Sequence, residues 1–200
     1  ALGSVDVGDV VLDVARASSV PWVVDPVVLS TSGAKLVDGN DDDVRRILVA
    51  LSSQATVFTP NRDEAAWLLE QDVVSKGDVV AAARQLLHIG DLVEGRAVIV
   101  TGGHDAQHQD VIEDVIAFVA AGEVRVKVVR HPRRDTDHTH GTGCALSSSI
   151  AAQLARQANV VEAIEGAIDL VDDGLRHAFS PGTGRGSVHV LSTTLAPVQR

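Results

Sequence analysis

The sequence has one cysteine, no methionine, no tyrosine, and only two tryptophans and three phenylalanines among 200 residues. A single cysteine excludes a disulfide within the chain. No apolar run approaches the roughly 18 residues that cross a bilayer, and no basic-then-apolar signal peptide stands at the start. We therefore expect a cytoplasmic protein with no membrane partner. The missing methionine, at position 1 as elsewhere, predicts that an N-terminal portion is absent from this sequence.

Positive charge is also scarce, with 17 Lys and Arg against 27 Asp and Glu and a net charge of −10. No cluster of basic residues interrupts this balance, which argues against a nucleic-acid partner. An acidic protein that handles phosphates needs a local positive site made of backbone amides or a bound cation. Magnesium is the usual cation.

Apolar periodicity predicts alternating strands and helices. Short β-branched runs indicate strands at 22–28, 56–58 and 97–100, and helical spacing indicates helices at 5–17, 41–51, 62–69, 79–88, 143–156 and 160–178. Segments 110–118 and 123–129 predict a β-hairpin, and 188–190 a short strand or extended tail. This order indicates a three-layer α/β/α fold with a mostly parallel central sheet.

The most informative motif is the glycine-rich turn from His140 to Cys144, which leads directly into an apolar-periodic helix. Glycines let backbone N–H groups converge, and a helix N-terminus adds about half a positive charge. Together they favour binding of phosphate or another oxyanion. The same field favours the thiolate of a cysteine placed there, so the turn points to phosphoryl transfer. The structural alternative is that Cys144 is a small buried apolar side chain.

Polar residues follow three of the predicted strands: Asp25, Asn61 with Glu64, and Thr101 to His104. Ligands of such sheets lie beyond the carboxyl ends of the strands, so we expect these residues at the same site. Each also has a plainer interpretation. Asn61 to Glu64 is a favourable helix start, and Asp25 stands before a proline as a strand-end turn residue.

Four segments in order resemble one enzyme family. They are Val24-Asp25-Pro26-Val27-Val28 with Thr31-Ser32-Gly33-Ala34, Thr59-Pro60-Asn61-Arg62-Asp63-Glu64-Ala65, Gly102-Gly103-His104, and Thr139-His140-Gly141-Thr142-Gly143-Cys144 with Leu146, Ser147 and Ile150-Ala151-Ala152. The chain resembles the hydroxymethylpyrimidine/phosphomethylpyrimidine kinases of thiamine biosynthesis, which have a ribokinase-like fold. The resemblance implies ATP-dependent phosphorylation of a pyrimidine hydroxymethyl group and then of its monophosphate.

The resemblance also implies roles for single residues. Cys144 would take the substrate hydroxyl proton, and Gly141, Thr142 and Gly143 would hold the transferring phosphoryl group. Asn61, Thr101 and Gly103 would bind the nucleotide. Glu64, through water, and Asp25 would hold Mg²⁺. Residues 183–186 and the helix from Val160 would border the adenine.

Two departures from the family stand out. Thr101 occupies the place of a lysine that neutralises phosphate charge, a role that Arg133 or Arg134 can take over. The family's glycine-rich start, which contributes to the pyrimidine pocket, does not precede Ala1. Family length predicts roughly eighty further residues there. We therefore expect residues 1–200 to form a single kinase domain that lacks an N-terminal segment.

Other functions stay open at this point. A pyridoxal kinase-like activity would use a related aromatic alcohol, although Cys144 favours the pyrimidine. A non-catalytic domain that binds a thiamine precursor or a nucleotide fits Thr101 better. His131, His138 and His140 raise a zinc alternative, but no cysteine or carboxylate stands at a recognised ligand spacing. Kinases of this fold are often homodimers, yet no residue here fixes an interface.

Overall fold

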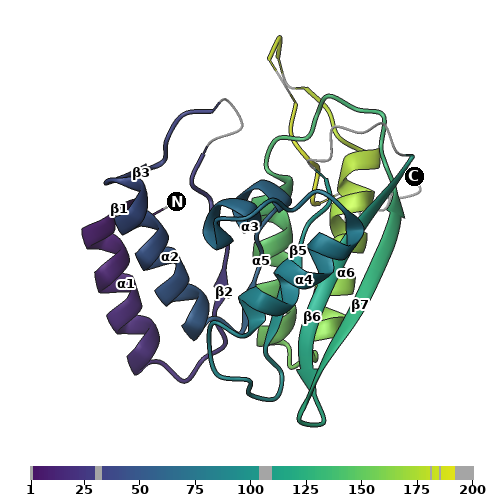
Figure 1. The fold of residues 1–200 in the computed structure, drawn as a ribbon. Coiled ribbons are helices and arrows are strands. Elements are labelled where there is room, and N and C mark those ends of the chain that lie inside the picture. Colours follow the sequence, from purple (N-terminus) through teal and green to yellow (C-terminus); the bar gives the residue numbers. More distant parts are fainter. Residues whose placement is uncertain (1, 30–32, 104–109, 181, 185, 192–200) are drawn as a thin grey trace.

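The fold is built around a mixed central sheet (Figure 1). The computed structural model describes residues 2–29, 33–103, 110–180, 182–184 and 186–191. Within them the sheet has the strand order β2-β4-β5-β6-β7. Its strands are β2 (Val23–Val24), β4 (Val57–Phe58), β5 (Ala97–Val100), β6 (Val111–Ala120) and β7 (Glu123–Pro132). The first three run parallel, and β6 and β7 form the predicted antiparallel hairpin.

Helices cover both faces of this sheet, which confirms the three-layer α/β/α prediction. The helices are α1 (Val5–Ala17), α2 (Asp41–Gln54), α3 (Arg62–Leu69), α4 (Lys76–Leu87), α5 (Thr142–Ala155) and α6 (Val160–Arg176). Side chains alternate along β5, so that Val98 and Val100 pack in the core with α2, α3 and α4. Ala97 and Ile99 pack against α5 and α6 on the opposite face.

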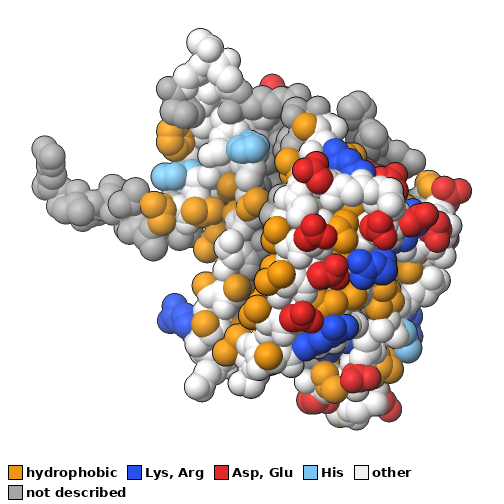
Figure 2. All heavy atoms as spheres, turned by 90° about the vertical axis from the view of Figure 1, so that its left-hand side faces the viewer, with side chains coloured by type: hydrophobic (Ala, Val, Ile, Leu, Met, Phe, Trp, Pro, Cys, Tyr) orange, Lys and Arg blue, Asp and Glu red, His pale blue; other side chains and the backbone are white. Residues whose placement is uncertain are grey.

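A second, two-stranded parallel sheet joins β1 (Gly3–Ser4) to β3 (Val37–Asp38). The sequence analysis missed it, because two residues are too few to show a periodicity. Beside it α1 packs on α2 through Leu12, Ile47 and Leu51. Figure 2 shows this side of the molecule, where hydrophobic side chains lie next to a region of acidic and basic ones. Among the described residues, no helix is both long enough and apolar enough to span a membrane.

Several predicted boundaries differ from the observed ones. The strand expected over 22–28 ends at Val24, since Pro26 has no N–H for a sheet ladder. Helix α4 begins at Lys76, three residues before the predicted start, because Ser75 and Asp78 form a capping box. No strand forms at 188–190, where Ser187 makes only isolated bridges to His140 and Phe179.

Candidate active site

The carboxyl ends of β2, β4 and β5 bring the predicted strand-end residues to one edge of the sheet. The Thr59 amide donates to the Val24 carbonyl at 3.0 Å, and the Thr101 amide donates to the Pro60 carbonyl at 3.0 Å. Asn61 and Thr101 pair through an isolated parallel bridge. Backbone hydrogen bonds therefore hold the segments that follow these three strands side by side.

The glycine-rich turn lies at the N-terminus of α5. Gly141 is the N-cap residue, with φ +84°, a left-handed conformation that glycine adopts without strain. Thr142 N donates to Thr139 O at 3.4 Å and Ala145 N to Gly141 O at 2.8 Å. The amides of Gly143 and Cys144 have no acceptor among the described residues, as expected of a helix start without a side-chain cap. They are free to bind an oxyanion.

Cys144 is exposed beside these amides. A buried structural cysteine, the alternative drawn from the sequence, is therefore wrong. The thiol is accessible to a substrate that enters at this edge of the sheet.

Asp25 lies against the turn from the β2 side. Its Oδ2 atom is 3.7 Å from the position that a Cβ atom on Gly143 would take. Burial raises the pKa of Asp25, and a hydrogen bond from the Thr59 hydroxyl partly offsets the effect. A carboxylate thus faces the anion-binding turn, so a phosphate bound there would lie against it and would favour a cation between the two.

Asn61 and Glu64 form a capping box at the start of α3. The Asn61 side chain accepts from Glu64 N at 2.8 Å, and Asn61 N donates to Glu64 Oε2 at 2.9 Å. The plainer interpretation as a helix start is therefore correct, but it leaves a second feature to explain. Burial, together with the charges of Asp25 and Asp63, raises the pKa of Glu64 to about 7 despite the hydrogen bond from Asn61.

Gly102 joins the end of β5 to the hairpin. Its amide donates to Asp114 Oδ1 at 2.8 Å, and Asp114 Oδ2 lies 3.0 Å from His131 Nε2. A Cβ atom at Gly102 would stand 2.3 Å from the carbonyl oxygen of Glu113, so only glycine fits. The adjoining Thr101 is half-buried and Gly103 is exposed.

The two arginines that can replace the missing lysine have different surroundings. Arg133 donates through Nη1 to the Gly103 carbonyl at 3.4 Å and so lies beside the end of β5. Arg134 instead forms two hydrogen bonds with Asp172, at 2.6 and 2.7 Å. Arg134 is thus held on α6, and only Arg133 remains a candidate for the lysine's role.

The three histidines of the zinc alternative have separate partners. His131 pairs with Asp114, His138 Nδ1 accepts from Gly186 N at 3.0 Å, and the His140 carbonyl accepts from Val188 N. Across the described part of the chain, no group of three or more His, Cys, Asp or Glu side chains is placed to hold a metal. The geometry gives zinc no support.

Two buried acids near this edge escaped the sequence analysis. Asp114 is 4% exposed and Asp172 is 9% exposed. Both had a detectable signal, since Asp114 precedes Ile116 by two strand positions and Asp172 follows Ile168 by one helical turn, on faces that are otherwise apolar. An acid on a buried face needs a partner, and the structure supplies one for each. The predicted motif residues Thr31, Ser32 and His104 lie outside the described residues.

The chain is similar to kinases with curated sequences. It is 32% identical over 171 residues to the hydroxymethylpyrimidine/phosphomethylpyrimidine kinase of Staphylococcus aureus (strain MSSA476). The aligned part covers 86% of this chain and 58% of the relative. The kinase of the same name from Streptomyces coelicolor is 34% identical over 188 residues, covering 94% of this chain and 65% of the relative. The chain thus spans less than two thirds of the length of these relatives.

The fold is likewise similar to solved structures. Bacillus subtilis pyridoxal kinase, determined as an ADP complex, superposes with a TM-score of 0.81 at 27% identity, over 98% of this chain and 70% of that one. This likeness confirms the ribokinase-like fold that the sequence motifs imply. A model of the family described as phosphomethylpyrimidine kinase matches residues 1–189, from before α1 to beyond α6. The chain belongs to the phosphomethylpyrimidine kinase family.

Proposed function

We propose that this chain carries the phosphoryl-transfer site of an ATP-dependent kinase for hydroxymethylpyrimidine and its monophosphate, as in thiamine biosynthesis. The observation that carries the proposal is the contact of Asp25 with Gly143. The helix amides that have no acceptor among the described residues, the exposed thiol and a half-buried acid therefore lie around one point. The names of the relatives supply the substrate class.

The residues of the turn have complementary roles. The amides of Gly143 and Cys144 hold the oxygens of the transferring phosphoryl group, with Gly141 and Thr142 shaping the helix start. Phosphoryl transfer needs mainly positioning and charge stabilisation, which fixed amides supply without rearrangement. The Cys144 sulfur accepts the proton of the substrate hydroxyl as that oxygen attacks the γ-phosphorus and the bond to the ADP oxygen breaks.

Asp25 and Glu64 suit a Mg²⁺ ion. Burial raises the pKa of both carboxyl groups, so both are stabilised by a cation. Mg²⁺ prefers oxygen ligands and is commonly held by one or two carboxylates, water and substrate phosphates. Asp25 and Glu64 are such a pair, Glu64 acting through water because its Oε2 atom already accepts from Asn61. When bound, the ion neutralises phosphate charge.

Nucleotide binding falls to Asn61, Thr101 and Gly103, which line the ends of β4 and β5. Thr101 has no charge to offer the triphosphate, and we assign that role to Arg133, whose guanidinium lies beside Gly103. The fold neighbours bound to ADP or to AMP-PCP support nucleotide binding at such a site. A cytoplasmic location and a homodimer stay predictions.

Pyridoxal is the second candidate substrate. The structural neighbours that superpose on this chain include several pyridoxal kinases, one of them solved with pyridoxal. Cys144 in the turn favours the pyrimidine, and an assay with both alcohols separates the two.

The test is ADP formation by the purified chain with Mg²⁺ and either hydroxymethylpyrimidine, its monophosphate or pyridoxal, alongside calorimetry with AMP-PCP. Cys144→Ala should lower turnover by about 10²–10⁴-fold and leave AMP-PCP binding unchanged. Faster turnover of pyridoxal than of the pyrimidines would contradict the substrate assignment. AMP-PCP binding without turnover of any alcohol would favour a non-catalytic nucleotide-binding domain.

A further inference from the structure

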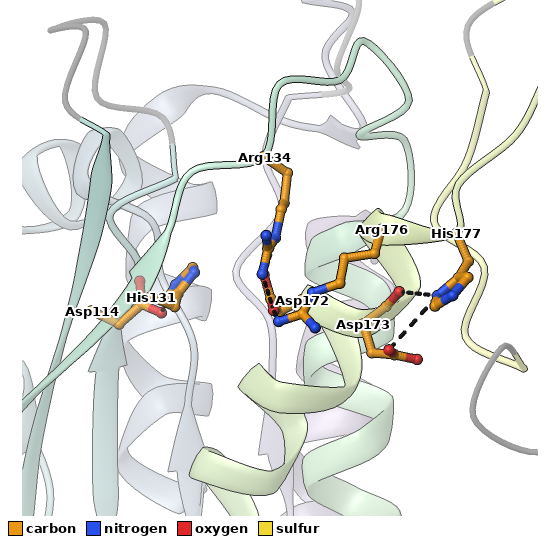
Figure 3. Close-up of polar contacts among 7 residues, drawn as sticks. All are labelled: Asp114, His131, Arg134, Asp172, Asp173, Arg176 and His177. Carbon is orange, nitrogen blue, oxygen red and sulfur yellow. Dashed lines mark hydrogen bonds and ion pairs between the residues drawn. The ribbon is translucent and has the colours of Figure 1, made fainter.

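The segment from Arg133 to His140 joins β7 to α5 without regular secondary structure and ends in the anion-binding turn. Helix α5 fixes the turn from one side, and Gly186 N and Val188 N bond to His138 Nδ1 and His140 O just before it. The placement of the turn also depends on what holds the start of the segment. Two buried carboxylates, Asp114 and Asp172, lie at its beginning (Figure 3).

Asp114 holds the start of the segment. Each of its two oxygens has a different partner. Oδ1 accepts from Gly102 N at 2.8 Å, and Oδ2 lies 3.0 Å from His131 Nε2. One carboxylate thus ties the loop after β5 to the last residues of β7. The loop after β5 contains Gly103, and the segment after β7 ends in the glycine-rich turn, so both lead to the proposed phosphate site.

Asp172 holds the segment one residue further on, at Arg134. Arg134 donates from Nε to Asp172 Oδ1 at 2.6 Å and from Nη2 to Oδ2 at 2.7 Å, a bidentate pair with fixed geometry. Arg176, one turn further along α6, adds a third bond to Oδ2 at 2.7 Å. Figure 3 shows Arg134 reaching from the segment down to Asp172 on the helix.

The charges of the cluster reinforce this geometry. The bonds from Arg134, and to a lesser degree from Arg176, lower the pKa of Asp172 against the effect of burial. Burial disfavours a charged His131, but the hydrogen bond and charge of Asp114, with the charge of Asp172, outweigh it and raise the pKa of His131. The groups facing His131 from β6 and α6 are thus both acids. Buried pairs of this kind fix position more than they add stability.

We propose that Asp172, through Arg134, is a positioning residue that sets the place of the anion-binding turn relative to Asp25, with Asp114 doing the same for the loop at Gly102. The proposal rests on the proposed function for the role of the turn. It assigns to two acids outside the recognised motifs a share in nucleotide binding.

The test compares two double variants. Arg134→Leu with Asp172→Leu removes the anchor without leaving a single unpaired member of the bidentate pair. Lys127→Leu with Glu165→Leu removes an ion pair that joins β7 itself to α6, with Nζ and Oε1 2.5 Å apart, far from the turn along both elements. Amide hydrogen exchange of the free proteins, their thermal midpoints and calorimetry with AMP-PCP and Mg²⁺ are measured in parallel.

Loss of the Asp172 anchor should raise exchange at 139–145 by about tenfold and weaken AMP-PCP binding about tenfold to a hundredfold. Loss of the Lys127 pair should change neither. Asp172→Asn, which keeps one acceptor oxygen, should fall between wild type and the double leucine variant. A lower thermal midpoint with unchanged exchange at the turn and unchanged affinity would overturn the proposal.

The proposed function and the positioning role of Asp172 can be contradicted separately. If the wild-type chain does not bind AMP-PCP, the proposed function is contradicted. The exchange comparison, made without nucleotide, then still decides whether Asp172 positions the turn. Equal exchange at 139–145 in the two double variants would overturn the positioning role even if wild type binds nucleotide.

Discussion

Both edges of the central sheet withdraw charged side chains from water, fully at one edge and partly at the other, and give them different partners. At the amino-terminal edge Arg96, 3% exposed, donates to the carbonyls of Ser52, Ser53 and Asp91 at 2.9, 3.0 and 3.3 Å. Ser52 and Ser53 belong to the last turn of α2, where a cation is favourable. At the carboxyl edge Asp25 and Glu64 make no ion pair with a described residue, and burial raises the pKa of each.

The comparison separates a structural charge from a functional one. The amino-terminal edge even has a cavity of about 230 Å³, lined by Ser53, Asp91, Arg96 and their neighbours. Its buried cation is already matched by fixed carbonyls, so a ligand there has little to add. At the opposite edge, the two acids have hydrogen bonds but no positively charged partner among the described residues, and a pair of amides there has no acceptor. Polar groups that lack a partner of opposite charge or an acceptor identify the functional site better than the cavity at the amino-terminal edge does.

Gly102→Ala should have the largest effect on stability, and it tests whether the carboxyl edge also contains a residue with a purely structural role. This glycine lies at the carboxyl edge, yet its role is packing, since a Cβ atom would meet the Glu113 carbonyl at 2.3 Å. We expect a loss of about 3 kcal/mol in the free energy of unfolding, measured by urea denaturation. Gly103→Ala is the control, because no atom lies within 4 Å of its added Cβ. Equal stability of the two variants would contradict the close approach to β6.

Arg96→Met should have the second-largest effect on the free energy of unfolding. The substitution leaves the carbonyls of Ser52 and Ser53 without their donor in a buried place, and we expect a loss of about 2 kcal/mol. AMP-PCP affinity should not change, because the opposite edge keeps its groups. Weaker nucleotide binding by the folded variant would show that the two edges are coupled.

Glu64→Gln removes an acid that has no positively charged partner among the described residues, while it retains an acceptor for Asn61 N. A raised folded pKa means that stability is lost as pH rises from about 4.5, the ordinary value, through about 7. The variant should therefore be more stable than wild type above pH 7, by about 1 kcal/mol, since partial exposure screens the charge. Parallel thermal melts from pH 4 to 8 measure the difference. A constant difference across this range would contradict the raised pKa.

Gly143→Ala should have the smallest effect on stability, within about 0.5 kcal/mol. The nearest atom to its added Cβ, Asp25 Oδ2, is at an ordinary contact distance of 3.7 Å. The methyl group would nevertheless stand between the free amides and the acid, so AMP-PCP binding should weaken. Ser148→Ala, exposed on the same helix, is the control. Unchanged affinity would remove this turn from the nucleotide site.

Much of the fold could be predicted from local pattern. The helix at 62–69 and the strand at 97–100 have the predicted bounds, because a capping box starts the first and an uninterrupted β-branched run makes the second. The β1–β3 pair could not be found, since two residues carry no period. The sequence leaves Arg133 and Arg134 as alternatives for the role of the missing lysine, because adjacent arginines look alike until Asp172 on α6 pairs with one of them.

The sequence alone determined which groups this protein brings to chemistry: a glycine turn that adopts φ +84°, a cysteine after it, and acids that follow apolar strands. These depend on backbone preferences within a few residues. Only the tertiary structure decided which charges remain without a partner. Pairing of Asp114 with His131 and of Asp172 with Arg134 joins residues 17 and 38 positions apart. The first pair follows from the register of β6 and β7, and the second from the packing of α6 beside the segment after β7, so no local pattern encodes either.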